Sequence, residues 1–332
     1  MRFLLADEQR EFARSLDAML TAAGTPAATR AWGAGDRAPG HALWSRLVDA
    51  GVFALPVPQE YEGVGPLPVE TAVAFVELGR HAVPGPAVET VAAAALLAHL
   101  AGQGEREPAK RFLPALASGA ARATLTLPDA LPGAGPYALD ADAADLVFAA
   151  SDDELRLAPG HARVHRSLDP ARRLAEPLPG GEPLASGPAV AAAARHAVDW
   201  AALATAAQAL GVGLALLDRT VAYVKQRAQF GAPIGSFQAV KHRLADVLVR
   251  LEFARPLVFG AATTMAAGDL AAAKVTASEA AYEAARAALQ LHGAIGYTAE
   301  FDLSLWLTKA RALRGAWGGP GVWRERVLSA RA

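Results

Sequence analysis

The sequence predicts a mainly helical protein with a small β domain in the middle of the chain. Three observations lead to this fold class: helix-type spacing of apolar residues at both ends, short strand-type runs between turn residues in the middle, and 53% hydrophobic residues among 332, enough for a large core. We expect an N-terminal helical domain at residues 1–118, a reduced β domain at 119–188 and a C-terminal four-helix bundle at 189–332.

The first region repeats the pattern of amphipathic helices. From Asp7 onward, Phe12, Leu16 and Met19 recur at spacings of three and four residues, which places them on one helix face. Proline and glycine breakers separate this segment from later ones, for example at residues 56–58. Further helical patterns cover residues 43–50, 68–78 and 88–100.

The middle of the chain changes character. Short runs of β-branched, leucine and aromatic residues alternate with Pro, Gly and Asp turns, a pattern typical of short strands. We interpret the Pro/Gly-rich stretch from Pro177 to Pro188 as the linker that closes this domain. The expected strands are residues 123–127, 146–150 and 154–157.

Long helical patterns return after Ala189. Leu210, Leu214, Leu217 and Val221 fall on one face at the spacing that bundle packing requires. These patterns predict a C-terminal bundle. Its expected helices include residues 203–224, 240–254, 271–291 and 302–313.

Composition argues against several classes of function. The 32 basic and 33 acidic residues give a net charge of −1, so nucleic acid and anionic membrane surfaces are not expected partners. Without cysteine the chain has no disulfide, catalytic thiolate or cysteine-ligated metal, and no His/Asp/Glu group has metal-ligand spacing. No segment resembles a signal peptide, and the apolar run at residues 91–100 is too short to span a bilayer, so we expect a cytoplasmic protein.

Three sequence blocks resemble signatures of the acyl-CoA dehydrogenase family. Residues 227–242 read R-A-Q-F-G-A-P-I-G-S-F-Q-A-V-K-H, similar to the family's RxQFGxPIGxFQxVxH. Residues 290–300 read Q-L-H-G-A-I-G-Y-T-A-E, similar to its Q-x-x-G-G-x-G-Y-T-x-E turn. Residues 58–65 read P-Q-E-Y-E-G-V-G, similar to its P-E-E-Y-G-G-x-G. The blocks stand in family order, so the chain is identified as a member.

The first block suits a dinucleotide. Arg227 is a permanently charged fork for a pyrophosphate, Phe230 and Ile234 offer apolar surface for adenine, and Gln229 and Gln238 supply amide hydrogen bonds. Taken singly, such an arginine is typical of a helix cap and such a phenylalanine of a turn anchor. The resemblance implies that together they hold the ADP end of FAD.

The second block adds three candidates for cofactor binding, Gln290, His292 and Gly293. Gly293 lets backbone approach a ligand closely because it has no side chain. His292 is also typical of a histidine packed between helices, and both interpretations stay open. In the family these elements reach a flavin seated mainly on the neighbouring chain, so the resemblance implies FAD shared across a subunit interface.

The chain lacks the family's catalytic glutamate at both positions where a member carries one. α,β-Dehydrogenation of a thioester needs a base for the α-proton, yet Ala201 and Gly318 occupy these positions. Asp199 lies two residues from Ala201, on a different helix face, and is a weak substitute. Glu300 belongs to the family's turn and is interpreted as structural. No catalytic residue is therefore assigned.

The loop that covers flavin and substrate in the family is also shortened. The family's T-E-P-x-x-G-S-D is reduced to T-L-P-D-A at residues 126–130, and the family's W-I/S-T/N strand beside the flavin ring has no clear counterpart. The chain thus keeps the ADP-binding elements while losing features of its own flavin-ring site.

These features favour a base-less subunit of a heteromeric α2β2 acyl-CoA dehydrogenase. A glutamate-bearing homologue would bind most of a bulky acyl-CoA substrate. The alternatives are a homo-oligomeric flavoenzyme with glutamate-independent chemistry and a cofactor-free structural or binding homologue. We expect the C-terminal bundle to form the interface. Its expected apolar contacts are Trp306, Leu307, Trp317 and Trp323, with packing inside the chain as the alternative for the tryptophans.

Overall fold

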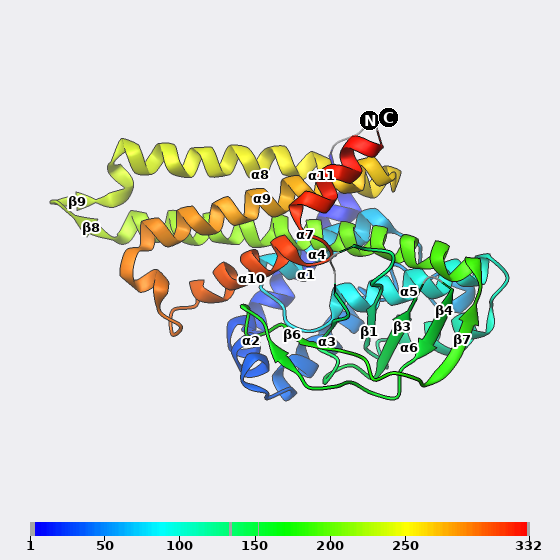
Figure 1. The fold of residues 1–332 in the computed structure, drawn as a ribbon. Coiled ribbons are helices and arrows are strands. Elements are labelled where there is room, and N and C mark those ends of the chain that lie inside the picture. The colour runs from blue at the N-terminus through cyan, green and yellow to red at the C-terminus, as the bar shows by residue number, and fades with distance from the viewer. Residues whose placement is uncertain (1–3, 133–134, 152, 331–332) are drawn as a thin grey trace.

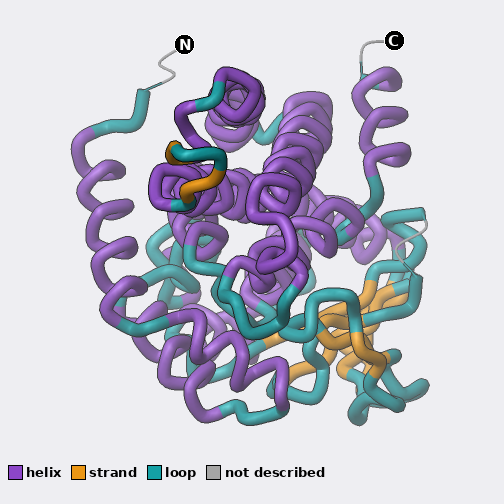
Figure 2. Tube along the Cα trace, turned by 90° about the vertical axis from the view of Figure 1, so that its left-hand side faces the viewer, coloured by secondary structure: helices purple, strands orange, loops and turns teal. Residues whose placement is uncertain are grey.

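The computed structural model describes residues 4–132, 135–151 and 153–330. Helices come first in the chain, small sheets follow, and long helices return, which confirms the predicted fold class (Figures 1 and 2). The helices before the sheets are α1 (Asp7–Ala22), α2 (Thr25–Ala34), α3 (Ala38–Asp49), α4 (Pro68–Arg80), α5 (Ala87–Gly102) and α6 (Glu107–Ala117), with the 3-10 helix η1 (Gln59–Tyr61).

The β region forms two small sheets. The first has the order β1-β3-β4-β7, with β1 and β3 parallel and the other pairs antiparallel. The second has the order β2-β6-β5. The first sheet lies beside α5 and α6, whereas β6 of the second sheet lies near α2 and α3 (Figure 1). The strands are β1 (Ala123–Thr126), β2 (Ala138–Leu139), β3 (Leu146–Ala150), β4 (Glu154–Leu157), β5 (His165–Arg166), β6 (Arg173–Ala175) and β7 (Glu182–Ser186).

The predicted linker between Pro177 and Pro188 is wrong in part, because it contains strand β7. Pro183 lies in that strand, opposite Arg156 of β4. A proline cannot donate to the ladder and is tolerated only on an edge strand, and β7 is the edge of its sheet. Pro183 therefore made this strand hard to predict from the sequence. At the edge of the sheet, its missing N–H donor is tolerated.

The long C-terminal helices confirm the expected bundle. α7, α8 and α9 run side by side, and the shorter α10 packs against α7 and α9 (Figure 1). A further helix, α11, was not predicted. The elements of this region are α7 (Pro188–Gln226), β8 (Ala228–Gln229), β9 (Ala232–Pro233), the 3-10 helix η2 (Ile234–Ser236), α8 (Gln238–Thr264), α9 (Ala267–His292), the 3-10 helix η3 (Gly293–Tyr297), α10 (Leu303–Gly315) and α11 (Pro320–Ser329).

Two glycines bring α4 and α7 into backbone contact. A Cβ on Gly79 would lie 2.0 Å from the carbonyl oxygen of Gln208, and one on Gly211 would lie 1.9 Å from that of Val76. Only glycine permits this approach. The crossing fixes the N-terminal helices against the bundle. α7 is long and apolar enough to cross a membrane, but its most apolar window is fully buried in the protein, so packing accounts for its composition.

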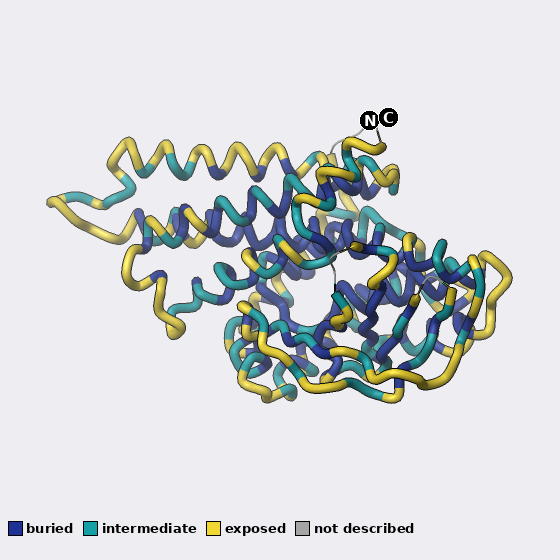
Figure 3. Tube along the Cα trace, in the orientation of Figure 1, coloured by how far each residue is buried: buried dark blue, intermediate teal, exposed yellow. Residues whose placement is uncertain are grey.

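The expected interface role of the C-terminal tryptophans is wrong for two of them. Trp306 and Trp323 are each 1% exposed and belong to the core of this chain. The indole of Trp306 donates to the carbonyl oxygen of Arg80 at 2.8 Å, and the guanidinium group of Arg219 lies 3.7 Å from its ring centre. Trp317 is half-buried. Four exposed apolar side chains of the bundle lie instead on α8, whose outer face is largely uncovered in Figure 3.

Candidate functional site

The first predicted block forms a projecting hairpin. α7 ends at Gln226, the backbone of Arg227 is extended, and β8 and β9 pair antiparallel. Phe230 and Gly231 make the turn with φ of 54° and 77°, the two positive values that a tight type I′ turn requires. Glycine adopts this conformation freely, whereas Phe230 is strained in it.

The side chains of this hairpin face solvent. Phe230 is 92% exposed, and its ring has an edge contact with Phe237 at 6.3 Å between centres. Arg227 is exposed, and its guanidinium group takes part in none of the hydrogen bonds or ion pairs found among the described residues. Gln229 and Gln238 are exposed too, while Ile234 is half-buried. The hairpin tip is accordingly free to contact another molecule (Figure 3).

The second block ends α9 at the same end of the bundle. Gln290 is exposed, and Gly293 terminates the helix with φ of 64° and open space where a Cβ would lie. His292 is only 5% exposed and stacks on Tyr223 of α7 at 4.1 Å between ring centres. Its Nδ1 lies 2.8 Å from the carbonyl oxygen of Ala288. The structure therefore places His292 between helices, with Gln290 and Gly293 on the surface.

The surroundings of His292 disfavour its protonated form. Burial lowers the pKa of the imidazole, and the hydrogen bond to the Ala288 carbonyl only partly offsets this effect. The hydroxyl group of Tyr223 donates to the carbonyl oxygen of His292 at 3.4 Å. Because Tyr223 lies four residues before Arg227, this contact holds the two blocks together at one end of the molecule.

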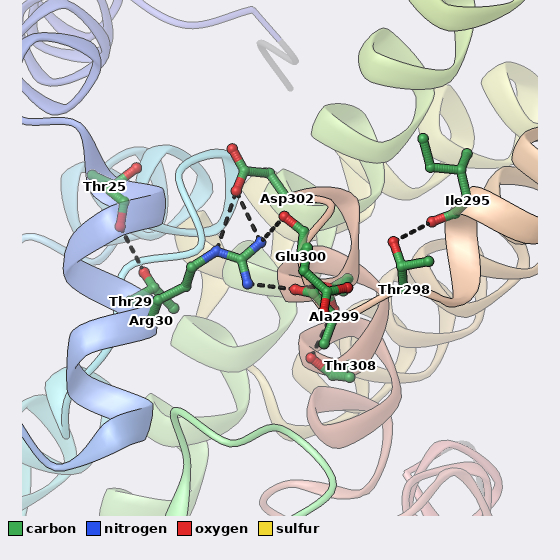
Figure 4. Close-up of polar contacts among 10 residues, drawn as sticks. Thr25, Thr29, Arg30, Ile295, Thr298, Ala299, Glu300, Asp302 and Thr308 are labelled. Atoms are coloured by element: carbon green, nitrogen blue, oxygen red, sulfur yellow. Dashed lines mark hydrogen bonds and ion pairs between the residues drawn. The ribbon is translucent and has the colours of Figure 1, made fainter.

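The segment after the second block is tied to the N-terminal helices. Figure 4 shows Arg30 of α2 reaching Asp302 and the backbone of the preceding residues. Its Nη2 donates to Asp302 Oδ1 at 3.0 Å and to the carbonyl oxygen of Glu300 at 3.0 Å. Glu300 is thus held through its main chain, while the residue itself is exposed.

Neither position of the missing base can hold a carboxylate without rearrangement. Ala201 is fully buried in α7. Gly318 has φ of 92°, and a Cβ there would lie 2.8 Å from Trp323 Nε1 and 3.3 Å from Leu131 Cδ1. The Trp323 indole also donates to the carbonyl oxygen of Trp317 at 2.7 Å. Trp317 and Trp323 therefore close the turn after α10.

Asp199, the weak substitute, is half-buried on α7. Burial raises the pKa of its carboxyl group to about 6, although the charge of Arg326 acts in the opposite direction. It does not line the cavity beside Trp317.

That cavity has a volume of about 240 Å³ and lies between β1, the second sheet and the end of α10. Thr126 and Leu127 of the shortened loop line it, together with Arg172 and Trp317. One further lining residue, Glu89, was missed from the sequence. It is a lone acidic residue in the apolar run that opens α5, and a charged group in such a run is rare unless it is paired. This lone acidic residue in an apolar run was the signal that the sequence offered for Glu89.

Solved structures of acyl-CoA dehydrogenases share the whole fold. The glutaryl-CoA dehydrogenase complex with glutaryl-CoA matches with a TM-score of 0.85 at 21% identity, covering 100% of this chain and 96% of that one. The steroid acyl-CoA dehydrogenase Tcur3481-Tcur3483, as its G363A variant, matches at 0.83 and 25% identity over 98% of both chains. The ChsE4-ChsE5 complex from Mycobacterium tuberculosis matches at 0.84 and 24% identity, over 99% and 98%. The fold is that of this class of flavoenzyme.

Sequence comparison establishes membership. Residues 6–120 match the acyl-CoA dehydrogenase N-terminal domain, and residues 191–330 match the C-terminal domain. Acyl-CoA dehydrogenase IpdE2 from M. tuberculosis is 39% identical over 91% of each chain, and FadE34 from the same species is 33% identical over 86% of this chain and 42% of its own length. The chain belongs to the acyl-CoA dehydrogenase family, oxidoreductases that act on the CH–CH bond of acyl-CoA with FAD as cofactor.

The residues present fit one part of FAD better than another. The exposed guanidinium group of Arg227 and the uncovered ring of Phe230 suit a pyrophosphate and an adenine. The cavity beside Trp317, at about 240 Å³, is smaller than the roughly 300–1,000 Å³ of pockets that enclose drug-sized ligands, and FAD is larger than such ligands. Two other cavities, each of about 470 Å³, are larger than this one. The fit therefore concerns the ADP end of FAD at the hairpin.

Proposed function

We propose that this chain is the base-less subunit of a heteromeric acyl-CoA dehydrogenase and that it binds the ADP end of FAD across a subunit interface. The observation that carries the proposal is the position of the hairpin. Arg227 and Phe230 project from the end of the bundle that lies away from the β1-β3-β4-β7 sheet and its cavity (Figure 1). In this proposal they serve a flavin held mainly by another chain.

Each subunit then has a distinct task. Arg227, Gln229, Gln238 and Gln290 of this chain would hold the pyrophosphate and adenine by charge-assisted and amide hydrogen bonds. FAD supplies the hydride acceptor for the β-carbon. The longer homologue would supply the carboxylate that removes the α-proton, since Ala201 and Gly318 offer none here.

The outer face of α8 supports the existence of a partner. Leu248, Val249, Phe253 and Leu257 recur at spacings of one, four and four residues and are 45%, 52%, 70% and 41% exposed. Apolar stripes of this kind on a soluble fold mark protein contacts. Phe237, which is 39% exposed, directly precedes α8 at its hairpin end, so an interface along the whole of α8 would also reach the hairpin.

The class of substrate comes from the relatives. Tcur3481-Tcur3483 is described as a steroid acyl-CoA dehydrogenase, and ChsE4-ChsE5 is described as a complex. With IpdE2 as a close relative over most of the chain, the proposed substrate is a bulky acyl-CoA of steroid type, bound mainly by the partner subunit.

Co-expression with a longer, glutamate-bearing homologue from the same genome tests the proposal. Native mass measurement should give a complex containing both chains, with FAD bound in the complex and little flavin on either chain alone. Dehydrogenation of acyl-CoA should require both chains. A homodimer of this chain saturated with FAD, or a monomer that ignores the homologue, contradicts the partner role; the homodimer would favour the self-sufficient flavoenzyme.

A pair of surface variants locates the interface. Phe253→Asp places a charge in the α8 stripe and should abolish assembly. Leu168→Asp is the matched control, because Leu168 is 62% exposed but lies in the β region. Equal assembly of the two variants would exclude the α8 stripe as the contact.

A further inference from the structure

Three side chains of metal-binding type meet where α1 packs against the end of α4. Asp17 lies on α1, Glu77 lies near the end of α4, and His81 directly follows that helix. One potential ligand atom from each side chain lies within 4.8 Å of those from the other two. The sequence does not show this group, because Asp17 lies 64 residues before His81 and only the fold brings the two helices together.

The carboxyl group of Glu77 is buried and incompletely satisfied. The residue is 8% exposed, and its Oε2 accepts no hydrogen bond within the described part of the chain. Arg80 Nε lies 3.6 Å from this oxygen, too far for a hydrogen bond, and Arg80 Nη2 instead donates to Asp218 at 3.1 Å. Because buried carboxylates are paired or coordinate metals, the unpaired oxygen points to a cation that binds beside it.

His81 and Asp17 supply the other two donors. His81 Nε2 lies 2.8 Å from Asp17 Oδ1. A cation can replace the proton between them, since neutral imidazole and carboxylate are both metal ligands. Tetrahedral zinc, with bonds of about 2.0–2.2 Å, needs ligand atoms roughly 3.3–3.6 Å apart. A separation of up to 4.8 Å closes by a small side-chain rotation, and the side chain of Asp17 is 53% exposed and faces solvent.

We propose that Asp17, Glu77 and His81 form a binding site for a divalent first-row transition-metal ion, with Zn²⁺ as the expected ion. One imidazole nitrogen with two carboxylate oxygens suits such an ion better than calcium or magnesium, which prefer oxygen ligands. A water molecule would complete the tetrahedron on the exposed side of Asp17. The competing explanation is an ordinary hydrogen-bonded pair of His81 and Asp17 beside a protonated Glu77.

The ion would fasten α1 to α4. Apart from this group, α1 is anchored by the buried Leu16 and Leu20 and by a hydrogen bond from Gln9 Nε2 to Glu70 Oε1 at 2.8 Å. A cation held by both helices therefore stabilises the docking of α1. The site lies in the N-terminal helices, away from the hairpin and the α8 stripe, so it does not depend on the partner-subunit proposal.

Calorimetric titration of Zn²⁺ into the full chain tests the site. The chain is prepared without a histidine tag and stripped of metal with a chelator. The titration is run at about pH 8, because metal ligands must be deprotonated and burial raises the pKa of the Glu77 carboxyl group to about 7. One ion should bind per chain with a Kd of about 10 µM or tighter. The ion should also raise the unfolding temperature, since it binds the folded chain.

Three variants each remove one ligand: Asp17→Asn, Glu77→Gln and His81→Gln. Each should weaken Zn²⁺ binding at least about tenfold, since losing even a group behind a ligand costs about 10–100-fold. Glu70→Gln is the matched control, because it removes a carboxylate at the same helix contact but outside the group, and it should bind Zn²⁺ as the wild type does. If Glu77→Gln does not fold, Asp17→Asn decides.

The proposal is overturned if the wild type shows no saturable binding, or if the ligand variants bind Zn²⁺ as tightly as the wild type. An equal loss in Glu70→Gln also overturns it, because the acidic surface would then attract the ion without a defined site. Because neither flavin nor partner is used, these outcomes are independent of the proposed function.

Discussion

Restoring a glutamate at residue 318 should destabilise the protein instead of recreating a catalytic base. Gly318 has φ of 92°, and a residue with a Cβ is disfavoured in left-handed backbone by about 1–2 kcal/mol. The new Cβ would also lie 2.8 Å from Trp323 Nε1, closer than such contacts allow. The indole must move and lose its 2.7 Å hydrogen bond to the Trp317 carbonyl, which is worth about 1 kcal/mol. The expected loss for Gly318→Glu is therefore about 2–3 kcal/mol.

Gly319→Glu is the matched control. Gly319 has φ of −74° and open space where a Cβ would lie, so the same side chain one residue later should change stability by no more than about 0.5 kcal/mol. Urea unfolding of both variants measures the difference. If Gly318→Glu proves as stable as Gly319→Glu, the inference that the turn excludes a side chain is refuted. Dehydrogenase activity regained by Gly318→Glu would contradict it as well.

Three further results follow from the geometry. In the complex with its homologue, Arg227→Ala should weaken FAD binding about tenfold or more, whereas Lys225→Ala, which removes an exposed charge two residues earlier, should not; equal effects would mean only a general electrostatic role. The purified single chain should show almost no dehydrogenation of acyl-CoA, because general-base catalysis contributes about 10²–10⁴-fold, and robust turnover in a spectrophotometric assay would contradict this. Burial raises the pKa of the Glu77 carboxyl group from 4.5 to about 7, so the folded state holds a proton that the unfolded state has lost. Stability should fall by up to about 3 kcal/mol as pH rises from 4.5 through 7, and thermal melts of Glu77→Gln should lack this fall.

The helices were predictable because their signal is local. Leu210, Leu214, Leu217 and Val221 recur along one stretch, and that stretch is part of α7. Strand β7 was not predictable in the same way. Pro183 argues against a strand unless the strand is known to lie at an edge, and sheet order depends on residues far away in the sequence. The proposed domain boundaries stay predictions.

The two candidate sites also differ in how far the sequence predicts them. The hairpin lies within one block of sequence, and its turn residues Phe230 and Gly231 are adjacent. The cavity is assembled from residues that include Glu89, Arg172 and Trp317, which no local pattern connects. The predicted interface role of Trp306 and Trp323 was wrong for a related reason. An apolar residue near the chain's end predicts burial, but the sequence does not say whether the surface that buries it belongs to the same chain.

Phe230 is energetically unfavourable in the isolated chain. Its backbone is strained at φ of 54°, where asparagine or glycine would fit better, and 92% of the residue is left in water. It packs little against its own chain beyond the edge contact with Phe237 at 6.3 Å. Strain of this kind persists where a function outside the local packing requires it. Because the hairpin stabilises its own fold so little, we expect it to contact another molecule, and the proposed second subunit with its flavin is that molecule.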